Sequence, residues 1–179
     1  MRIVSGKFGG RRIQPPAKMP YTRPTTDIAK EGLFNILQNR IALEGIRTLD
    51  LFGGTGSISY ELASRGAGEI VIVEKDVNMH AFIKKNMAML GVEQCQVLRM
   101  DVFDYINHCN ESFDFIFAGP PYALGPIDEI PKLIVARNMI AAGGFFVLEH
   151  TPRNNYEKFV GFSFQRNYGT TIFSFFEAV

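Results

Sequence analysis

The chain has 179 residues, of which 46% are hydrophobic and 12% aromatic, and its net charge is +1. This length can bury one sizeable core but is too short for two comfortable domains. No stretch approaches the roughly 20 consecutive apolar residues of a membrane span, and the N-terminus lacks the pattern of a signal peptide, so we expect a cytoplasmic protein. Cys95 and Cys109 lack metal-site spacing and a nearby histidine cluster, so we predict no metal site.

Charge is distributed unevenly along the chain. Six of the 19 basic residues precede Asp27, the first acidic residue, so the remaining 13 are set against 18 acidic residues. Residues 1–24 contain two short runs around a glycine-rich turn and then several prolines, which predicts a basic hairpin arm and linker ahead of one domain at 25–179. A basic arm on an acidic body favours a polyanionic partner, and a merely solvated terminus is the alternative.

The apolar pattern predicts the elements of this domain. Thr25-Thr26-Asp27 is typical of a helix start, and that helix should reach about Gln38. Short apolar strands then alternate with helices. The expected strands are 46–52, 69–74, 96–100, 113–118 and 144–149, and the expected helices are 56–65, 77–90, 102–108 and 127–140. Such alternation predicts a parallel, doubly wound α/β sheet.

The last two predicted strands, 160–167 and 171–178, are too close together for a crossover helix. They must therefore pair antiparallel. A mostly parallel Rossmann-like sheet that ends in an antiparallel hairpin is the architecture of a class I methyltransferase, whereas dehydrogenase folds generally lack that hairpin. The three histidines, His80, His108 and His150, share no spacing and are expected to be surface or capping residues.

A glycine-rich turn, Asp-Leu-Phe-Gly-Gly-Thr-Gly at 50–56, joins the first strand to its helix. Glycines let a ligand approach the backbone, and the helix N-terminus offers unpaired N–H groups. The stretch 54–59 almost fits the dinucleotide pattern G-x-G-x-x-G, but its third glycine is Ser59. Asp50 would repel a pyrophosphate and attract a cation, which favours S-adenosylmethionine.

Two further acids follow the next two strands. Glu74 is placed to accept the ribose hydroxyls, and Asp101 to accept the adenine amine while the backbone of Val102 meets the ring. Either acid alone could be a helix cap or a solvated strand end. Together with Asp50 and the glycines they predict a site for S-adenosylmethionine. The candidate cofactor-binding residues are Thr25, Asp50, Phe52, Gly53, Gly54, Gly56, Glu74, Lys75, Asp101 and Val102.

The tetrapeptide Gly119-Pro120-Pro121-Tyr122 follows the fourth predicted strand. X-Pro-Pro-Tyr after a strand is typical of methyl transfer to the exocyclic amine of a flat base, so these four residues are the candidate catalytic segment. The first position is ordinarily a carboxylate or amide that accepts a hydrogen bond from the amine, and Gly119 offers only its carbonyl. Positioning groups of this kind contribute about 10²–10⁴ in rate. Asp114 lies near the other end of the strand, too far away to substitute.

The chain resembles, nearly end to end, the RsmD family of bacterial 16S rRNA guanine-N2 methyltransferases. The resemblance is carried by Arg23-Pro24-Thr25-Thr26-Asp27, the 50–56 turn, Ser64-Arg65-Gly66-Ala67, the Pro-Pro-Tyr, Glu149-His150 and the glycine-rich 5–12 segment. It implies methylation of one guanine in small-subunit rRNA within an assembled or assembling particle. In that case Tyr122 would clamp the flipped base, and phosphates would be bound by Arg2, Lys7, Arg11, Arg12 and Arg23.

Gly119 departs from the family's Asp, and it leaves other interpretations open. It can be a substitution, the mark of an inactive natural variant, or a site where another acceptor takes over. The main alternative is therefore an rRNA-binding assembly protein that still binds S-adenosylmethionine but is catalytically impaired. An adenine-N6 nucleic-acid methylase would need a separate recognition region, and a small dehydrogenase would bind nicotinamide instead. We expect a monomer.

Overall fold

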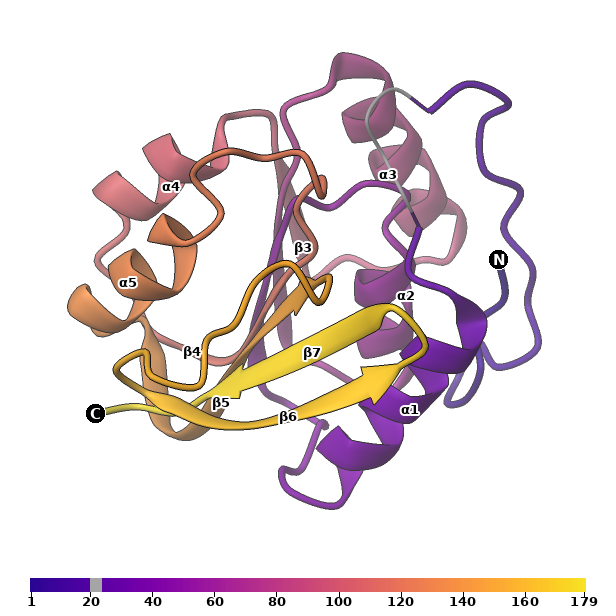
Figure 1. Ribbon diagram of the computed structural model, residues 1–179. Helices are drawn as coiled ribbons and strands as arrows, with labels where there is room; N and C mark the ends of the chain where they lie inside the picture. The colour runs from indigo at the N-terminus through magenta and orange to yellow at the C-terminus, as the bar shows by residue number, and fades with distance from the viewer. Residues whose placement is uncertain (20–23) are drawn as a thin grey trace.

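The computed structural model describes residues 1–19 and 24–179, and these form a seven-stranded sheet with helices on both faces (Figure 1). The strands are β1 (Arg47–Leu51), β2 (Glu69–Val73), β3 (Cys95–Leu98), β4 (Phe113–Ala118), β5 (Ile140–His150), β6 (Phe162–Tyr168) and β7 (Thr171–Phe176). The helices are α1 (Asp27–Gln38), α2 (Ser57–Ser64), α3 (Val77–Met89), α4 (Val102–His108) and α5 (Glu129–Ala136).

The strand order is β3-β2-β1-β4-β5-β7-β6. Strands β1 to β5 pair in parallel, and β7 pairs antiparallel with both β5 and β6. The predicted α/β fold with its antiparallel ending is therefore confirmed. In register, Leu51 lies opposite Val73 on one side and Ala118 on the other, so three loops leave the same edge. The strand order reverses between β1 and β4, where open α/β sheets form their binding crevice.

Two apolar layers cover the sheet, and alternation along each strand divides its side chains between them. On β2, Ile70 and Ile72 pack in the layer under α1, α2 and α3, while Val71 and Val73 pack in the layer under α4 and α5. Figure 1 shows these two groups of helices on opposite sides of the sheet. Every residue of α2 is buried, because the N-terminal segment covers its outer side.

The N-terminal segment forms a small hairpin with minimal pairing. Arg2 and Arg12 form one antiparallel bridge, flanked by a hydrogen bond from the Ile3 N–H to the Arg11 carbonyl (2.9 Å). Ile3, Phe8 and Ile13 are buried in the α1–α3 layer. Gly6 has a φ of +82°, and a Cβ there would lie 2.1 Å from the Ser64 carbonyl oxygen. Only glycine allows the turn to approach α2 so closely.

Two boundaries differ from the sequence prediction by about four residues, and the others by two at most. Helix α5 ends at Ala136 rather than near 140, and β5 begins at Ile140 rather than 144. Asn138 adopts a left-handed conformation, with φ of 52°, which ends the helix and releases the following apolar residues into the sheet. The prediction for His150 was wrong, because its side chain is completely buried at the end of β5.

Candidate functional site

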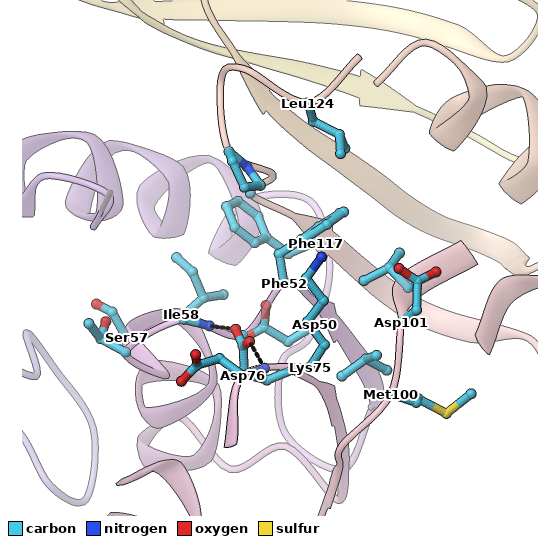
Figure 2. A pocket seen from close by; sticks show the side chains of 18 of the residues that line it. Asp50, Phe52, Ser57, Ile58, Lys75, Asp76, Met100, Asp101, Phe117 and Leu124 are labelled. Atoms are coloured by element: carbon cyan, nitrogen blue, oxygen red, sulfur yellow. Dashed lines mark hydrogen bonds between the residues drawn. The ribbon is translucent and has the colours of Figure 1, made fainter. Parts of the chain in front are cut away.

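A cavity of about 500 Å³ opens at the carboxyl edge of the parallel strands. Its volume is within the usual range of about 300–1,000 Å³ for small-molecule sites. Figure 2 shows side chains gathered around it from the ends of the strands and the loops that follow them, among them Asp50, Lys75 and Asp101. Nine of the ten candidate cofactor residues line it, namely Thr25, Asp50, Phe52, Gly53, Gly54, Glu74, Lys75, Asp101 and Val102.

The tenth candidate, Gly56, does not line the cavity. It caps the N-terminus of α2 with a φ of 85°, and a Cβ there would lie 2.6 Å from the Tyr60 ring. Phe52 also has a positive φ, 63°, at the start of the turn. A non-glycine residue in this region is strained, and such strain clusters at ligand sites. The conformation of the turn is therefore constrained by packing against Tyr60 on one side and by the ligand cavity on the other.

Asp50 is buried on the floor of the cavity, 2% exposed. The Ser59 hydroxyl donates a hydrogen bond to it at 2.7 Å. Burial raises the pKa of Asp50 to about 7; the Ser59 bond opposes this rise and the nearby Glu74 charge adds to it. A cation that enters the cavity would favour the ionised form of Asp50 and be favoured by it.

Glu74 and Asp101 line the cavity and also hold backbone in place. The Glu74 carboxylate accepts hydrogen bonds from the Gly54 N–H and the Asp76 N–H, both at 2.8 Å (dashed in Figure 2). Asp101 caps α4 by accepting from the Phe103 and Asp104 N–H groups at 2.8 and 3.2 Å. Each carboxylate has further acceptor capacity, so capping and ligand binding are compatible.

Thr25 reaches the cavity from the segment before α1. Its hydroxyl donates to the buried Glu149 carboxylate at 2.5 Å, which ties that segment to the end of β5. The neighbouring His150 ring pairs with the Ser174 hydroxyl at 2.7 Å and with the Thr151 carbonyl at 2.9 Å. Burial lowers the pKa of His150, so the ring is held neutral as part of the framework. Glu149 does not line the cavity but holds Thr25 there, and our candidate set lacked it although the Glu149-His150 motif was its signal.

Three of the four candidate catalytic residues line a hollow, and they divide between two hollows. Gly119 and Pro121 line the 500 Å³ cavity, Pro120 is buried, and Tyr122 lines a second, shallower recess of about 430 Å³. The Gly119 N–H points at the Leu51 carbonyl of β1, 3.4 Å away. Asp114 is engaged at the opposite end of β4, where it accepts from the Arg47 N–H at 2.9 Å.

The basic residues of the arm remain accessible. Arg2, Lys7, Arg11 and Arg12 are exposed, whereas Arg23 lies outside the described residues. Phe8 packs inward, with the Lys7 and Arg11 cations 5.5 and 5.2 Å from its ring centre. The arm therefore presents cations on a fixed hairpin.

A buried ionic cluster holds this arm, and sequence reasoning missed it. Glu61 accepts from the Val4 and Ser5 N–H groups at 2.8 and 3.1 Å. The Lys30 ammonium lies 3.7 Å from Glu61 and donates to the Arg2 carbonyl at 2.6 Å and to the Ser57 hydroxyl at 3.2 Å. The only signal for this cluster was an acid inside the otherwise uncharged α2.

Neither a membrane-spanning helix nor a group of three or more metal-ligating side chains is found within residues 1–19 and 24–179.

The fold and cavity match a known family. The family model described as conserved hypothetical protein 95, the RsmD family, matches residues 1–177. The chain belongs to the RsmD family. Among curated relatives, YlbH of Bacillus subtilis, a provisionally named rRNA methyltransferase, is 34% identical over 84% of this chain and 82% of that protein. Ribosomal RNA small subunit methyltransferase D of Escherichia coli K12 is 28% identical over 86% of this chain and 76% of that protein.

Solved structures of similar proteins have the same class I methyltransferase fold. The hypothetical protein TTHA0928 of Thermus thermophilus superposes with a TM-score of 0.86 at 29% identity over 99% of both chains. The T. thermophilus 16S rRNA N2 G1207 methyltransferase RsmC, in complex with AdoMet and guanosine, superposes with a TM-score of 0.69 at 28% identity. That match covers 87% of this RsmD-family chain and 44% of RsmC.

Proposed function

We propose that this RsmD-family protein transfers a methyl group from S-adenosylmethionine to the N2 amine of a guanine in 16S rRNA. The observation that carries the proposal is the continuity of one cavity from the acidic turn at Asp50 to Gly119 and Pro121. The coarser conclusion, an rRNA methyltransferase that uses S-adenosylmethionine, agrees with the names of its relatives and with the AdoMet held by one of them.

The residues of the cavity suit S-adenosylmethionine, which supplies an electrophilic methyl group on a sulfonium. Asp50 contributes negative charge where the ligand is cationic. Glu74 lies at the end of β2, where its free acceptor capacity suits ribose hydroxyls, and Asp101 and the Val102 backbone suit the adenine edge. Lys75 and Phe52 would pack along the ligand. Each of these roles is a proposal.

The acceptor base would enter beside the 119–122 segment after flipping out of its RNA stack. The lone pair of a guanine N2 amine is delocalised into the ring, so attack requires an acceptor that lets the amine pyramidalise. Gly119 and Pro120 offer backbone carbonyls for this, and Tyr122 offers a ring to hold the base. Alignment of the reacting atoms, rather than proton transfer, is the main contribution expected of the segment.

The exposed cations Arg2, Lys7, Arg11 and Arg12 would bind rRNA phosphates, as would Arg23. Such contacts position a protein on RNA and carry little sequence information. The shape of the small-subunit particle would then select the guanine. A monomeric state and a cytoplasmic location stay predictions.

Gly119 supports one competing candidate, a catalytically impaired protein that binds rRNA and the cofactor. A side chain at this position would be close to the cavity, since Gly119 lines it. The family's usual carboxylate is missing there, and within the described residues Asp114 is held elsewhere. An adenine-N6 methylase remains a weaker second alternative, because no observation on the chain favours it.

The decisive experiment compares methyl transfer by the protein, Gly119→Asp and Gly119→Ala on small-subunit particles that lack the modification. A Cβ at 119 would lie 3.1 Å from the edge of the Phe117 ring, which lines the cavity, and Gly119 does not require a positive φ. We expect Gly119→Asp to raise the rate by about 10²–10⁴, with Gly119→Ala no faster than the original.

Equal transfer by all three proteins would show that a backbone carbonyl suffices and that our account of the carboxylate is wrong. No transfer by any of them, with S-adenosylmethionine binding intact by calorimetry, would overturn the rRNA substrate.

A further inference from the structure

The recess that Tyr122 lines is distinct from the cofactor cavity. Its walls come from three separate loops and consist of Tyr122, Thr151, Pro152, Arg153 and Thr170. Pro121 lines the cavity and Tyr122 lines the recess, so the two hollows adjoin across one peptide unit of about 3.8 Å. A ligand group bound in the cavity beside Pro121 would therefore lie near the recess.

The recess is cationic. Arg153 is its one charged lining residue among those described, and no acid lines it. Within the described chain the Arg153 side chain makes no ion pair, in contrast to Arg47 and Arg65, which are paired with Glu69 and Glu61. Thr151 and Thr170 line the same recess. An unpaired guanidinium beside two threonines suits a phosphodiester.

The loop that carries Arg153 is fixed at both ends. The Arg153 N–H donates to the Thr151 hydroxyl at 3.3 Å, and the Thr151 carbonyl is hydrogen-bonded to the buried His150 ring. Beyond it, the buried Tyr156 packs its ring 4.8 Å from that of His150 and donates its hydroxyl to Asp128 at 2.9 Å. A loop held in this way loses little entropy when it binds a ligand, which favours affinity.

We propose that this recess binds the sugar-phosphate backbone of the target nucleotide, with Arg153 on a phosphate. The proposal rests on the proposed function and adds to it a second anchor, separate from the N-terminal arm. A flipped base keeps its ribose and phosphates outside the base pocket. The backbone of a base held by Gly119, Pro120 and the Tyr122 ring would then lie at the recess and within reach of Arg153.

The placement of the recess suits an RNA strand that continues from the target nucleotide toward the N-terminal arm. Thr170 belongs to the turn between β6 and β7, and in Figure 1 this turn lies beside α1. Tyr168, at the same end of the hairpin, packs so closely on α1 that a Cβ at Gly32 would lie 2.3 Å from its ring. The arm docks on the same helix through Lys30.

The test measures binding of the protein to undermodified small-subunit particles as a function of salt, for the protein, Arg153→Ala and Arg153→Lys. Loss of one phosphate contact should weaken binding about tenfold and flatten the slope of log affinity against log salt by about 0.7–0.9. Arg153→Lys should recover most of both, since a lysine can also bind a phosphate as a point charge.

Arg166→Ala is the matched control, because Arg166 is exposed on the β6–β7 hairpin that carries Thr170, stacks on Phe164 at 4.8 Å and does not line the recess. It should change the slope much less than Arg153→Ala. S-adenosylmethionine affinity, measured by calorimetry, should be the same in all four proteins.

Each outcome decides a separate point. If the unaltered protein binds particles but Arg153→Ala binds with the same affinity and slope, the recess does not hold a phosphate. If Arg153→Lys is as weak as Arg153→Ala, the guanidinium reads a base edge or stacks, and the phosphate assignment is overturned. If the unaltered protein does not bind particles at all, the proposed function fails instead.

Discussion

Two carboxylates are buried on neighbouring parts of this protein, and their surroundings differ. Glu61, in the middle of α2, is completely buried and has four donors around it. The Val4 and Ser5 N–H groups and the Arg65 guanidinium donate to it, and the Lys30 ammonium lies 3.7 Å away. Its charge is compensated, and its partners are the arm and the helices that the arm covers.

Asp50, at the end of β1, is nearly as buried but accepts one hydrogen bond within the described residues, from Ser59. Its pKa is raised to about 7, and it faces the cavity. A buried charge with a full set of donors is part of the architecture, whereas one that lacks them stores unfavourable energy that a ligand can relieve. We therefore call Glu61 the anchoring acid and Asp50 the binding acid.

We expect the largest effect on stability from a substitution of Glu61, the anchoring acid. Glu61→Ala would leave the Lys30 ammonium, itself 1% exposed, without its counter-charge and would strip two arm N–H groups of their acceptor. We expect a loss of about 3–5 kcal/mol in the free energy of unfolding, measured in urea. Glu69→Ala, which removes a half-exposed partner of Arg47, should cost no more than about 1 kcal/mol. Equal losses in the two variants would contradict an anchoring role for Glu61.

Asp50→Asn should act in the opposite direction on stability. Because the folded pKa is raised above the unfolded value of 3.8, the folded state binds this proton more tightly, and stability is lost as pH rises from about 4 through 7. The amide avoids that loss, so the variant should be more stable than the original at pH 8 and nearly equal to it at pH 4.

The same substitution should weaken S-adenosylmethionine binding about ten- to a hundredfold, as expected for a lost interaction with a charged group. Thermal unfolding at both pH values and calorimetric titration measure the two effects. A variant that is destabilised at pH 8, or that binds the cofactor unchanged, would place Asp50 with Glu61 among the anchoring acids.

Much of the binding acid's surroundings could be predicted from the sequence. Residues that follow consecutive parallel strands meet at one edge of the sheet, so Asp50, Glu74 and Asp101 could be brought together from strand positions alone. The alternation of strands and helices likewise predicted the parallel part of the sheet, and the short spacing of the last two strands predicted the final hairpin. Gly56 was expected at the cavity but does not line it, because its constraint comes from the Tyr60 ring rather than from a ligand.

The anchoring acid could not be predicted in the same way. The burial of α2 depends on a hairpin more than 50 residues earlier in the chain, and no local sequence pattern predicts the contact between that hairpin and Glu61. Lys30 lies in a helix that the sequence predicted, but a lysine there would ordinarily be solvated. The recess beside Tyr122 was missed because its walls come from three loops that only the folded sheet brings together.

The smallest effect we predict is a pH dependence that distinguishes the two acids in solution. If a cation binds only when Asp50 is ionised, S-adenosylmethionine affinity should rise about eightfold between pH 6 and pH 7.5, given a pKa of about 7 in the free protein. Binding at pH 7 should release about half a proton, which calorimetry in buffers of different ionisation enthalpy measures. The ligand's own amine titrates near 7.7–8.0, so the profile is read as the ratio of the original protein to Asp50→Asn, in which that contribution cancels. A ratio independent of pH would mean that Asp50 does not exchange its proton for the ligand, and the distinction between the two buried acids would then rest on stability alone.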